Sequence, residues 1–406
     1  MPRVSKLQIC VLMFLHAFAL GAYLVPLPTV MTAHGMTDYI TVPLITASVA
    51  AFISPLIFGS LADRKYAPER LLGIVALGGS ILMGVAGLTL HYHMGAIWFL
   101  VAMGAYYFWA APGWGLLTAI GLMNVDDPQR EFAPLRVWAT IGFMVGAAFV
   151  SFVLGADRSP TTTFLAAGFF FVESIYCFML PPTKSAAAAA PKRLRDYFGW
   201  DAIQLLKQRN HRMIFLTSAL FSIPLASFYP YASKQLDSLG IDHPSGVLSV
   251  AQLSEIVGMY GLAAIMGRFR LKWLIIAGLV CGIIRYSLFS TNNYGLVVTG
   301  IVFHGLIFIF FSMTTQIYLE QRVEHSMRNQ AQALLLVMNG GIGNLSGYLL
   351  GTWLYQVCLV DGKENWTSFW GILTIGIIAV SVFFLVGYRG LGKREEKTAP
   401  ETTNPI

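Results

Sequence analysis

The sequence predicts an all-α polytopic membrane protein with twelve transmembrane helices, arranged as two groups of six with both termini in the cytoplasm. Three observations support this fold class. Of the 406 residues, 56% are hydrophobic and only 12% are charged, long apolar runs recur along the chain, and basic residues gather in alternate loops. An ordinary soluble domain is about one quarter charged. This composition, with a mean hydropathy of +0.64, excludes a soluble enzyme, a disordered protein and a nucleic-acid binder.

Twelve apolar runs are long enough to cross a bilayer, for which a helix needs about 20 mostly apolar residues. The first run is too long for a signal peptide and lacks an A-x-A cleavage site. Prolines interrupt spans 1, 4 and 7, and such breaks often serve rocking gates. The predicted spans are residues 7–31, 41–62, 71–90, 95–122, 134–156, 162–181, 213–236, 247–266, 271–290, 294–319, 331–357 and 367–388.

The basic residues predict the orientation. Only Arg158, Lys234 and Lys363 of the 27 Lys and Arg fall in the loops on one side, and Arg285 lies inside a span. The others lie on the opposite side, which is therefore the cytoplasmic side. The same bias explains the net charge of +7 without a nucleic-acid partner.

The longest polar stretch lies midway along the chain and predicts the domain organisation. Residues 1–182 form an N-terminal six-helix bundle, and residues 213–390 form a C-terminal one. Residues 183–212 are a cytoplasmic linker in which aromatic and aliphatic residues alternate with Lys and Arg, a pattern typical of an amphipathic interfacial helix. Residues 391–406 are a cytoplasmic tail. Two six-helix halves joined by a basic loop resemble the layout of the major facilitator superfamily.

The loop between spans 2 and 3 strengthens this resemblance. It reads GSLADR from Gly59 to Asp63 and Arg64, which is similar to the signature loop of that superfamily. Glycine permits close helix contact, and an Asp next to an Arg can cap a helix and form an ion pair. We therefore expect these residues to form a cytoplasmic gating loop. A short basic loop as such is also common in membrane proteins.

Ionisable residues inside spans are costly and usually face a cavity or a partner. Arg136, Thr140 and Phe143 share one face of span 5, because they lie at positions i, i+4 and i+7. Gln252 and Glu255 share a face of span 8. The two faces are candidate walls of a solute site, and Glu255 is a candidate proton carrier. Alternatively, Arg136 snorkels to the interface, and Glu255 forms a structural ion pair with Arg136 or Arg285.

For four other polar residues inside spans, structural roles are the favoured interpretation. Glu173 is expected at a helix interface, and Arg285 is expected to pair with a carboxylate or to reach the outer surface. His16 and His304 are candidate proton or substrate contacts, although a lone membrane histidine commonly forms an interhelical hydrogen bond.

Within the superfamily, the chain resembles the bacterial nucleoside:proton symporters over nearly its full length. The strongest blocks are RVWATIGF at 136–143, QLSE at 252–255 and MRNQAQ at 327–332. The resemblance implies that Arg136, Thr140 and Phe143 hold the substrate from one side and that Gln252 and Glu255 hold it from the other. It implies that Phe308 stacks on the base, and it places His304 where nucleoside carriers tend to have Tyr. Leu225, Phe228 and Ile309 depart from the polar or acidic residues of the family pattern.

These observations predict a secondary active transporter, and not an enzyme, in a bacterial inner membrane. It would move nucleosides or a related small polar solute by alternating access with proton coupling, for which Glu255 and Arg136 are the candidate residues. The alternatives are a carrier of a sugar, nucleobase or drug-like compound, or a solute sensor that transports nothing. No cofactor and no metal are expected. The expected partners are a nucleoside-like solute, protons and membrane lipid, and the chain is expected to act as a monomer.

Overall fold

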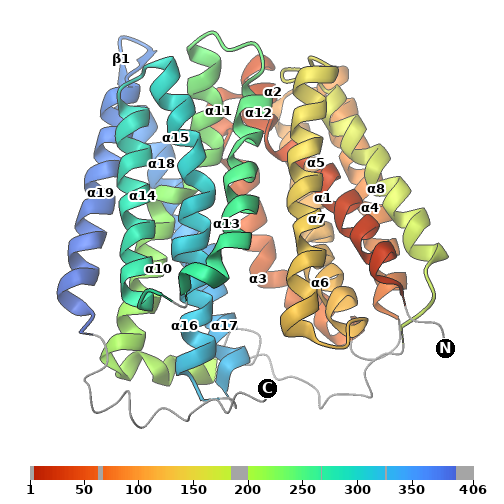
Figure 1. Ribbon diagram of the computed structural model, residues 1–406. Coiled ribbons are helices and arrows are strands. Elements are labelled where there is room, and N and C mark those ends of the chain that lie inside the picture. Colours follow the sequence, from red (N-terminus) through yellow and green to blue (C-terminus); the bar gives the residue numbers. More distant parts are fainter. Residues whose placement is uncertain (1–3, 63–66, 184–199, 267, 325–326, 390–406) are drawn as a thin grey trace.

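The computed structural model describes residues 4–62, 67–183, 200–266, 268–324 and 327–389, and these residues are almost entirely helical. The helices run roughly parallel and form two bundles side by side (Figure 1). The N-terminal half is α1 (Lys6–Leu24), α2 (Leu27–Ala33), η1 (Thr37–Tyr39), α3 (Val42–Ala62), α4 (Pro68–His91), α5 (Ala96–Ala110), α6 (Gly113–Met123), α7 (Pro128–Ala148), η2 (Phe149–Val153) and α8 (Thr161–Met179). The C-terminal half is η3 (Trp200–Lys207), α10 (Arg209–Ala226), α11 (Phe228–Ser238), α12 (Pro244–Ser249), α13 (Ala251–Met266), α14 (Leu271–Ser290), α15 (Tyr294–Ile307), η4 (Phe308–Met313), α16 (Thr314–Arg322), α17 (Arg328–Leu336), η6 (Val337–Gly343), α18 (Asn344–Val357), β1 (Leu359–Val360), β2 (Lys363–Glu364) and α19 (Trp366–Gly387).

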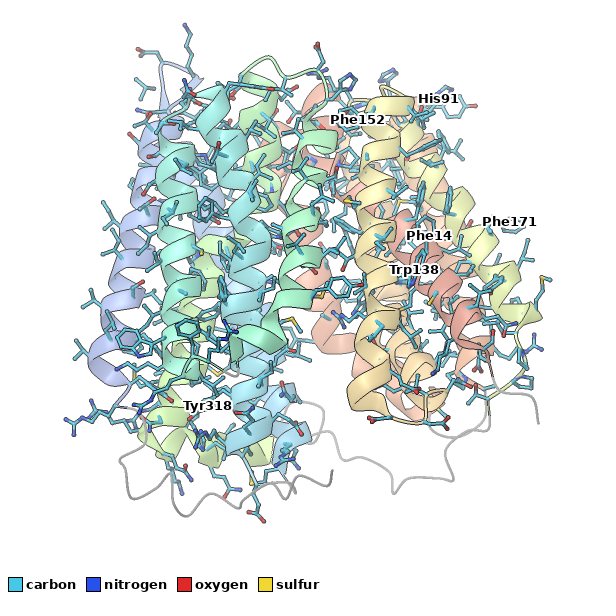
Figure 2. All side chains as sticks on the ribbon, in the orientation of Figure 1. Phe14, His91, Trp138, Phe152, Phe171 and Tyr318 are labelled. Carbon is cyan, nitrogen blue, oxygen red and sulfur yellow. The ribbon has the colours of Figure 1, made fainter. Side chains whose placement is uncertain are left out.

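The outside of the molecule is apolar, as expected for a surface that faces lipid. Large hydrophobic side chains such as Trp138 and Phe171 are 44% and 49% exposed, and Figure 2 shows how such side chains surround the bundles. Among the described residues, ten helices are long and apolar enough to cross a membrane. The other two predicted spans fall on α3 and on α12 followed by α13.

Three of the four predicted proline breaks lie where helices end, and the fourth, Pro230, lies in the first turn of α11 (Phe228–Ser238). Near Pro26, α1 ends at Leu24 and α2 begins at Leu27; Pro112 lies between α5 and α6; α10 ends two residues after Pro224. Proline cannot donate the backbone hydrogen bond that would continue the preceding helix. Each of these three long spans is therefore built from two helical segments.

The linker is described only from residue 200 onwards, where the predicted amphipathic helix is a short 3-10 helix, η3. Its Ala202 and Leu205 are buried in the core that η3 shares with the C-terminal half, and η3 packs against α10 and α17. The apolar face of this segment therefore covers protein, where the sequence suggested a face against lipid.

Polar contacts between the halves occur at the upper end of Figure 1, away from the end where α1 begins and α19 ends. Arg158 forms an ion pair with Asp237, and the buried Asp157 carboxylate accepts a hydrogen bond from the backbone nitrogen of Ser245 at 3.1 Å. The hydroxyls of Thr41 and Thr352 are 2.6 Å apart. These contacts join the two bundles at that end.

Candidate functional site

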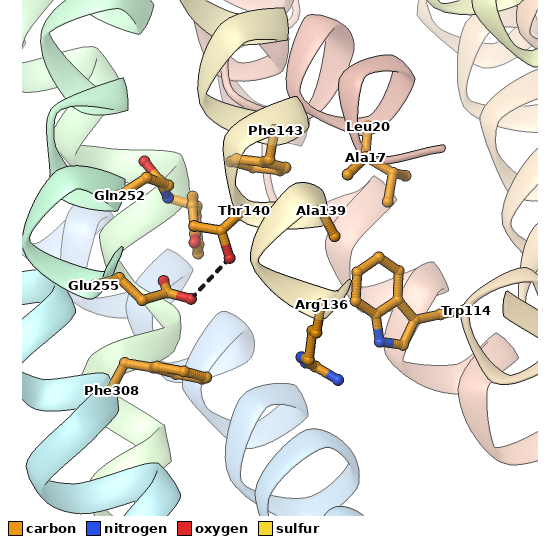
Figure 3. Close-up of a pocket in the computed structure, with 11 residues that line it drawn as sticks. Ala17, Leu20, Trp114, Arg136, Ala139, Thr140, Phe143, Gln252, Glu255 and Phe308 are labelled. Atoms are coloured by element: carbon orange, nitrogen blue, oxygen red, sulfur yellow. Dashed lines mark hydrogen bonds between the residues drawn. The ribbon is translucent and has the colours of Figure 1, made fainter. Parts of the chain in front are cut away.

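A cavity of about 300 Å³ lies between the two halves at mid-depth (Figure 3). Two neighbouring cavities share lining residues with it, so the three form one continuous lining across the interior. Its lining combines a cation, a carboxylate, an amide, a hydroxyl and several aromatic rings. The lining residues are Ala17, Leu20, Trp114, Arg136, Ala139, Thr140, Phe143, Tyr229, Gln252, Glu255 and Phe308.

The N-terminal wall is a stripe of α7 that is fixed by close packing against α1. A methyl group on Gly142 would overlap the backbone carbonyl of Phe14, so only glycine permits this approach. The stripe presents Arg136, Thr140 and Phe143 to the cavity. The guanidinium carbon of Arg136 lies 5.3 Å from the centroid of the Trp114 ring, a distance at which a cation is attracted to the face of an aromatic ring.

The C-terminal wall carries Gln252 and Glu255 on α13. Gly305 of α15 lets the two helices touch, because a side chain there would overlap the backbone of Glu255. The Thr140 hydroxyl donates a hydrogen bond of 3.3 Å to the Glu255 carboxylate. In Figure 3 these two side chains face each other, with Phe143 above and Phe308 below them.

Glu255 has no ion pair with a described residue, although the sequence left Arg136 and Arg285 open as its partners. Its hydrogen bond to Thr140 is thus the polar link that the structure describes between the two walls. Because this link involves a carboxyl group, its strength depends on whether Glu255 holds a proton.

Phe308 begins η4, a π-helical stretch, and lines the cavity. Such stretches are often found at functional sites. The next residue, Ile309, is buried and packs against Gly258 of α13. It lines a separate apolar groove that shares no lining residue with the central cavity.

His304 lies in an adjoining cavity of about 370 Å³, which also contains Glu255 and Phe308. Its ring stacks on Phe228 with centroids 4.9 Å apart, and its Nε2 atom is 3.5 Å from the Tyr229 hydroxyl. All seven predicted substrate-binding residues therefore lie on one continuous lining.

Of the two remaining charges inside the membrane, Glu173 lies where it was expected and Arg285 does not. Glu173 lies at a helix interface, as expected, where its carboxylate accepts a hydrogen bond of 2.9 Å from His16 Nδ1. The expectation for Arg285 is wrong: it is 1% exposed, and among the described residues it has no carboxylate partner. The reason is the rotation of α14, which turns the guanidinium over the ring of Phe228, 3.5 Å from its centroid.

The predicted gating loop is largely outside the described residues. Gly59 lies in α3, which ends at Ala62, while Asp63 and Arg64 fall among residues that the structure does not describe. The structure therefore does not test the latch.

The sequence patterns did not identify two aromatic residues of the cavity, Trp114 and Tyr229. Both follow a break in a proline-interrupted span, Trp114 two residues after Pro112 and Tyr229 near the start of α11. The position of an aromatic ring just after such a break was the signal that could have identified them.

Comparisons with known proteins agree with the fold and with the resemblance seen in the sequence. A family model described as "Nucleoside H+ symporter" matches residues 4–392. The putative nucleoside transporter YegT of Escherichia coli (strain K12) is 30% identical over 96% of this chain and 94% of that protein. The xanthosine permease of the same organism is 27% identical over 94% of this chain and 96% of that protein. The crystal structure of the nucleoside transporter NupG superposes with a TM-score of 0.83, at 23% identity, over 95% of this chain and 99% of that one.

Proposed function

Because this chain belongs to the nucleoside H+ symporter family, we propose that it carries nucleosides by alternating access, with a proton taken up on Glu255. The chain is an integral membrane transporter of the bacterial inner-membrane type and not an enzyme, as its family and its long apolar helices establish. The proposal concerns the solute and the residues that bind it.

The cavity between the two walls is the observation that carries this proposal. Phe143 and Phe308 supply aromatic surface to a flat base, and Thr140 and Gln252 supply hydrogen-bonding groups to hydroxyls. Since the two halves each contribute one wall, a bound solute would contact both of them. Rocking of the halves about the solute would then move it from one side of the membrane to the other.

The position of Glu255 supports proton coupling. As a carboxylate it accepts the hydrogen bond from Thr140 across the cavity, and as a protonated acid it becomes a donor to the solute. At a membrane potential of about 100 mV, one inward proton is worth about 2.3 kcal/mol, which supports roughly fifty-fold accumulation of a neutral solute.

We further propose twelve spans, cytoplasmic termini, a six-plus-six organisation and a monomeric carrier. The loop ends that carry Arg158, Lys234 and Lys363 would be the outer side. The contacts of Asp157 and Arg158 between the halves at that end support a state closed to the outside. At the opposite end, the ion pairs Lys6–Glu131 and Arg328–Glu320 each stay within one half.

Uptake of labelled uridine and inosine into proteoliposomes, with and without an inward proton gradient, tests this proposal. The gradient should drive accumulation in the wild type, and Glu255→Gln should reduce the carrier to equilibration because the amide holds no exchangeable acid proton. Glu324→Gln is the matched control, since Glu324 is exposed outside the cavity, and it should accumulate solute normally.

Gradient-independent equilibration by the wild type would refute symport. Accumulation by Glu255→Gln at the wild-type level would remove Glu255 from the mechanism. If sugars, nucleobases or drug-like compounds are taken up and nucleosides are not, the chain is a carrier for another solute. Binding without flux would identify a sensor.

A further inference from the structure

Arg285 is a buried cation whose hydrogen-bonding groups are only partly used. One face of its guanidinium covers Phe228, with the central carbon 3.5 Å from the ring centroid, and Tyr286 and Phe289 lie at 5.4 Å and 5.6 Å. Within the described part of the chain, its Nε and Nη2 atoms have no hydrogen-bond partner. A buried donor without a partner destabilises a protein, and more so when it is charged, so the aromatic contacts alone do not account for its presence.

Arg285 is one of the residues that line a cavity. Arg285, His304 and Asn339 all line the cavity of about 370 Å³ that adjoins the nucleoside site. His304 Nδ1 and Asn339 Oδ1 are also buried without a partner among the described residues. Residues with unsatisfied polar atoms thus surround one space, and a ligand that reached these atoms would give each of them a hydrogen bond.

The charges around the cavities favour an anion. Of the residues that line the three connected cavities, Arg136 and Arg285 carry guanidinium groups, and Glu255 is the carboxylate. A guanidinium cannot be deprotonated in a protein, and it donates to planar acceptors in a fixed fork. The lining described here therefore has an excess of positive charge, which a neutral solute leaves uncompensated.

We propose that Arg285 sets the specificity of this carrier by binding an anionic or carbonyl-bearing edge of the solute's heterocycle. The preferred class is then an oxopurine nucleoside whose base loses a proton near neutral pH, such as a dioxopurine. This inference rests on the proposed nucleoside transport and goes beyond it, because it selects among nucleosides. Adenosine would present an amino donor to the donors of Arg285 and is disfavoured.

The geometry separates the roles of the two arginines. Arg136 and Glu255 line the first cavity, which would receive any nucleoside. Arg285 lines only the adjoining one, which shares Tyr229, Glu255 and Phe308 with the first. A solute that spans both cavities would place its sugar and its base against different arginines, so loss of Arg285 should change selectivity and loss of Arg136 should weaken all solutes.

Binding of xanthosine, inosine and adenosine to the purified protein tests the assignment. We expect the wild type to prefer xanthosine over adenosine, and Arg285→Gln to lose about tenfold to a hundredfold of that preference, since a hydrogen bond to a charged group is being removed. Arg285→Lys keeps the charge and should retain part of the preference. Arg136→Gln should weaken the three nucleosides by similar factors and leave their order unchanged.

The pH dependence of binding separates an anion site from a structural role. Wild-type affinity for xanthosine should rise with pH through the titration of the xanthine base, relative to inosine, and this relative rise should vanish in Arg285→Gln. Inosine serves as the reference ligand, because protein groups near Arg285 that titrate affect the binding of inosine and of xanthosine alike. These groups are Tyr229, Glu255, Tyr286, His304 and Tyr348.

Other results would contradict the role of Arg285 or the proposed function. Equal loss of all three nucleosides in Arg285→Gln, or a preference for adenosine in the wild type, would overturn it and leave the proposed transport function intact. If the wild type binds no nucleoside, the proposed function itself fails, and this inference fails with it.

Discussion

The two halves of the molecule differ in whether their buried polar groups have hydrogen-bond partners. In the N-terminal half, His16 and Glu173 are bonded to each other across α1 and α8, and Arg136 lies near the ring of Trp114. In the C-terminal half, Arg285 and His304 line a cavity, and Nε and Nη2 of Arg285 and Nδ1 of His304 are buried without a partner among the described residues. Most of the described buried side-chain atoms that lack a partner belong to this half.

This difference separates a buried pair that joins two helices, His16–Glu173, from a buried cation that lines a cavity, Arg285. The pair His16–Glu173 is bonded across α1 and α8, and only Glu173 Oε2 stays without a partner among the described residues. An unsatisfied group destabilises the empty protein and recovers that free energy when a ligand supplies the missing bond. We therefore expect substitutions in the N-terminal pair to act on stability, and substitutions at Arg285 to act on selectivity.

The largest effect is expected when the N-terminal pair is broken from one side. Replacing His16 with Leu leaves the fully buried Glu173 carboxylate without its partner, and such a change typically costs about 3–5 kcal/mol. The melting temperature of the purified protein should fall strongly. The double variant His16→Leu/Glu173→Leu should recover much of the loss, because no charge is then left buried. A mild single variant would contradict the supporting role of the pair.

Removal of the Arg285 cation from the C-terminal half should change the stability of the protein in the opposite direction. Arg285→Met takes away an unsatisfied buried charge and keeps an apolar side chain against Phe228. We expect the ligand-free protein to become more stable by about 1–2 kcal/mol, because the relief of the unpaired donors exceeds the lost cation–π attraction. Thermal unfolding without nucleoside measures this change. A clear loss of stability would show that Arg285 is structural and would erase the contrast between the halves.

Much of this architecture could be predicted from the sequence, because the signals are local. Apolar length predicts spans, and the i, i+4, i+7 spacing predicts which side chains share a face. That is why Arg136, Thr140 and Phe143 were grouped correctly on α7, and why the breaks at the prolines were anticipated. The lining of the cavity confirms these shared faces, while the binding roles of the residues stay predictions.

The parts that could not be predicted depend on how helices are rotated against one another. The pairing of His16 with Glu173 joins residues that are 157 positions apart, and no local pattern encodes it. The environment of Arg285 depends on the packing of α14 against Phe228 of α11. The sequence shows a charge in a span, and only the tertiary structure shows whether that charge is paired.

The smallest expected effect concerns a paired charge of the C-terminal half, at the upper end of the molecule. Glu364 lies outside the spans and accepts contacts from Lys234 at 3.1 Å and from the Tyr355 hydroxyl at 3.2 Å. Partial burial would by itself raise the pKa of Glu364, but its hydrogen bonds from Lys234, from the backbone and from Tyr355, together with the charge of Lys234, outweigh burial and lower the pKa. This group therefore resembles the N-terminal pair more than it resembles Arg285.

A lowered pKa in the folded protein fixes the sign of the pH dependence. The stabilisation by Glu364 is complete above the pKa of the unfolded chain, and it is lost as the pH falls through the lowered pKa of the folded state. Because Glu364 is partly exposed, we expect about 1 kcal/mol or less. Melting temperatures measured from pH 7 down to acid conditions should fall less steeply for Glu364→Gln than for the wild type. Parallel curves would mean that the pair with Lys234 contributes nothing, and that satisfied and unsatisfied charges in this half differ only inside the cavity.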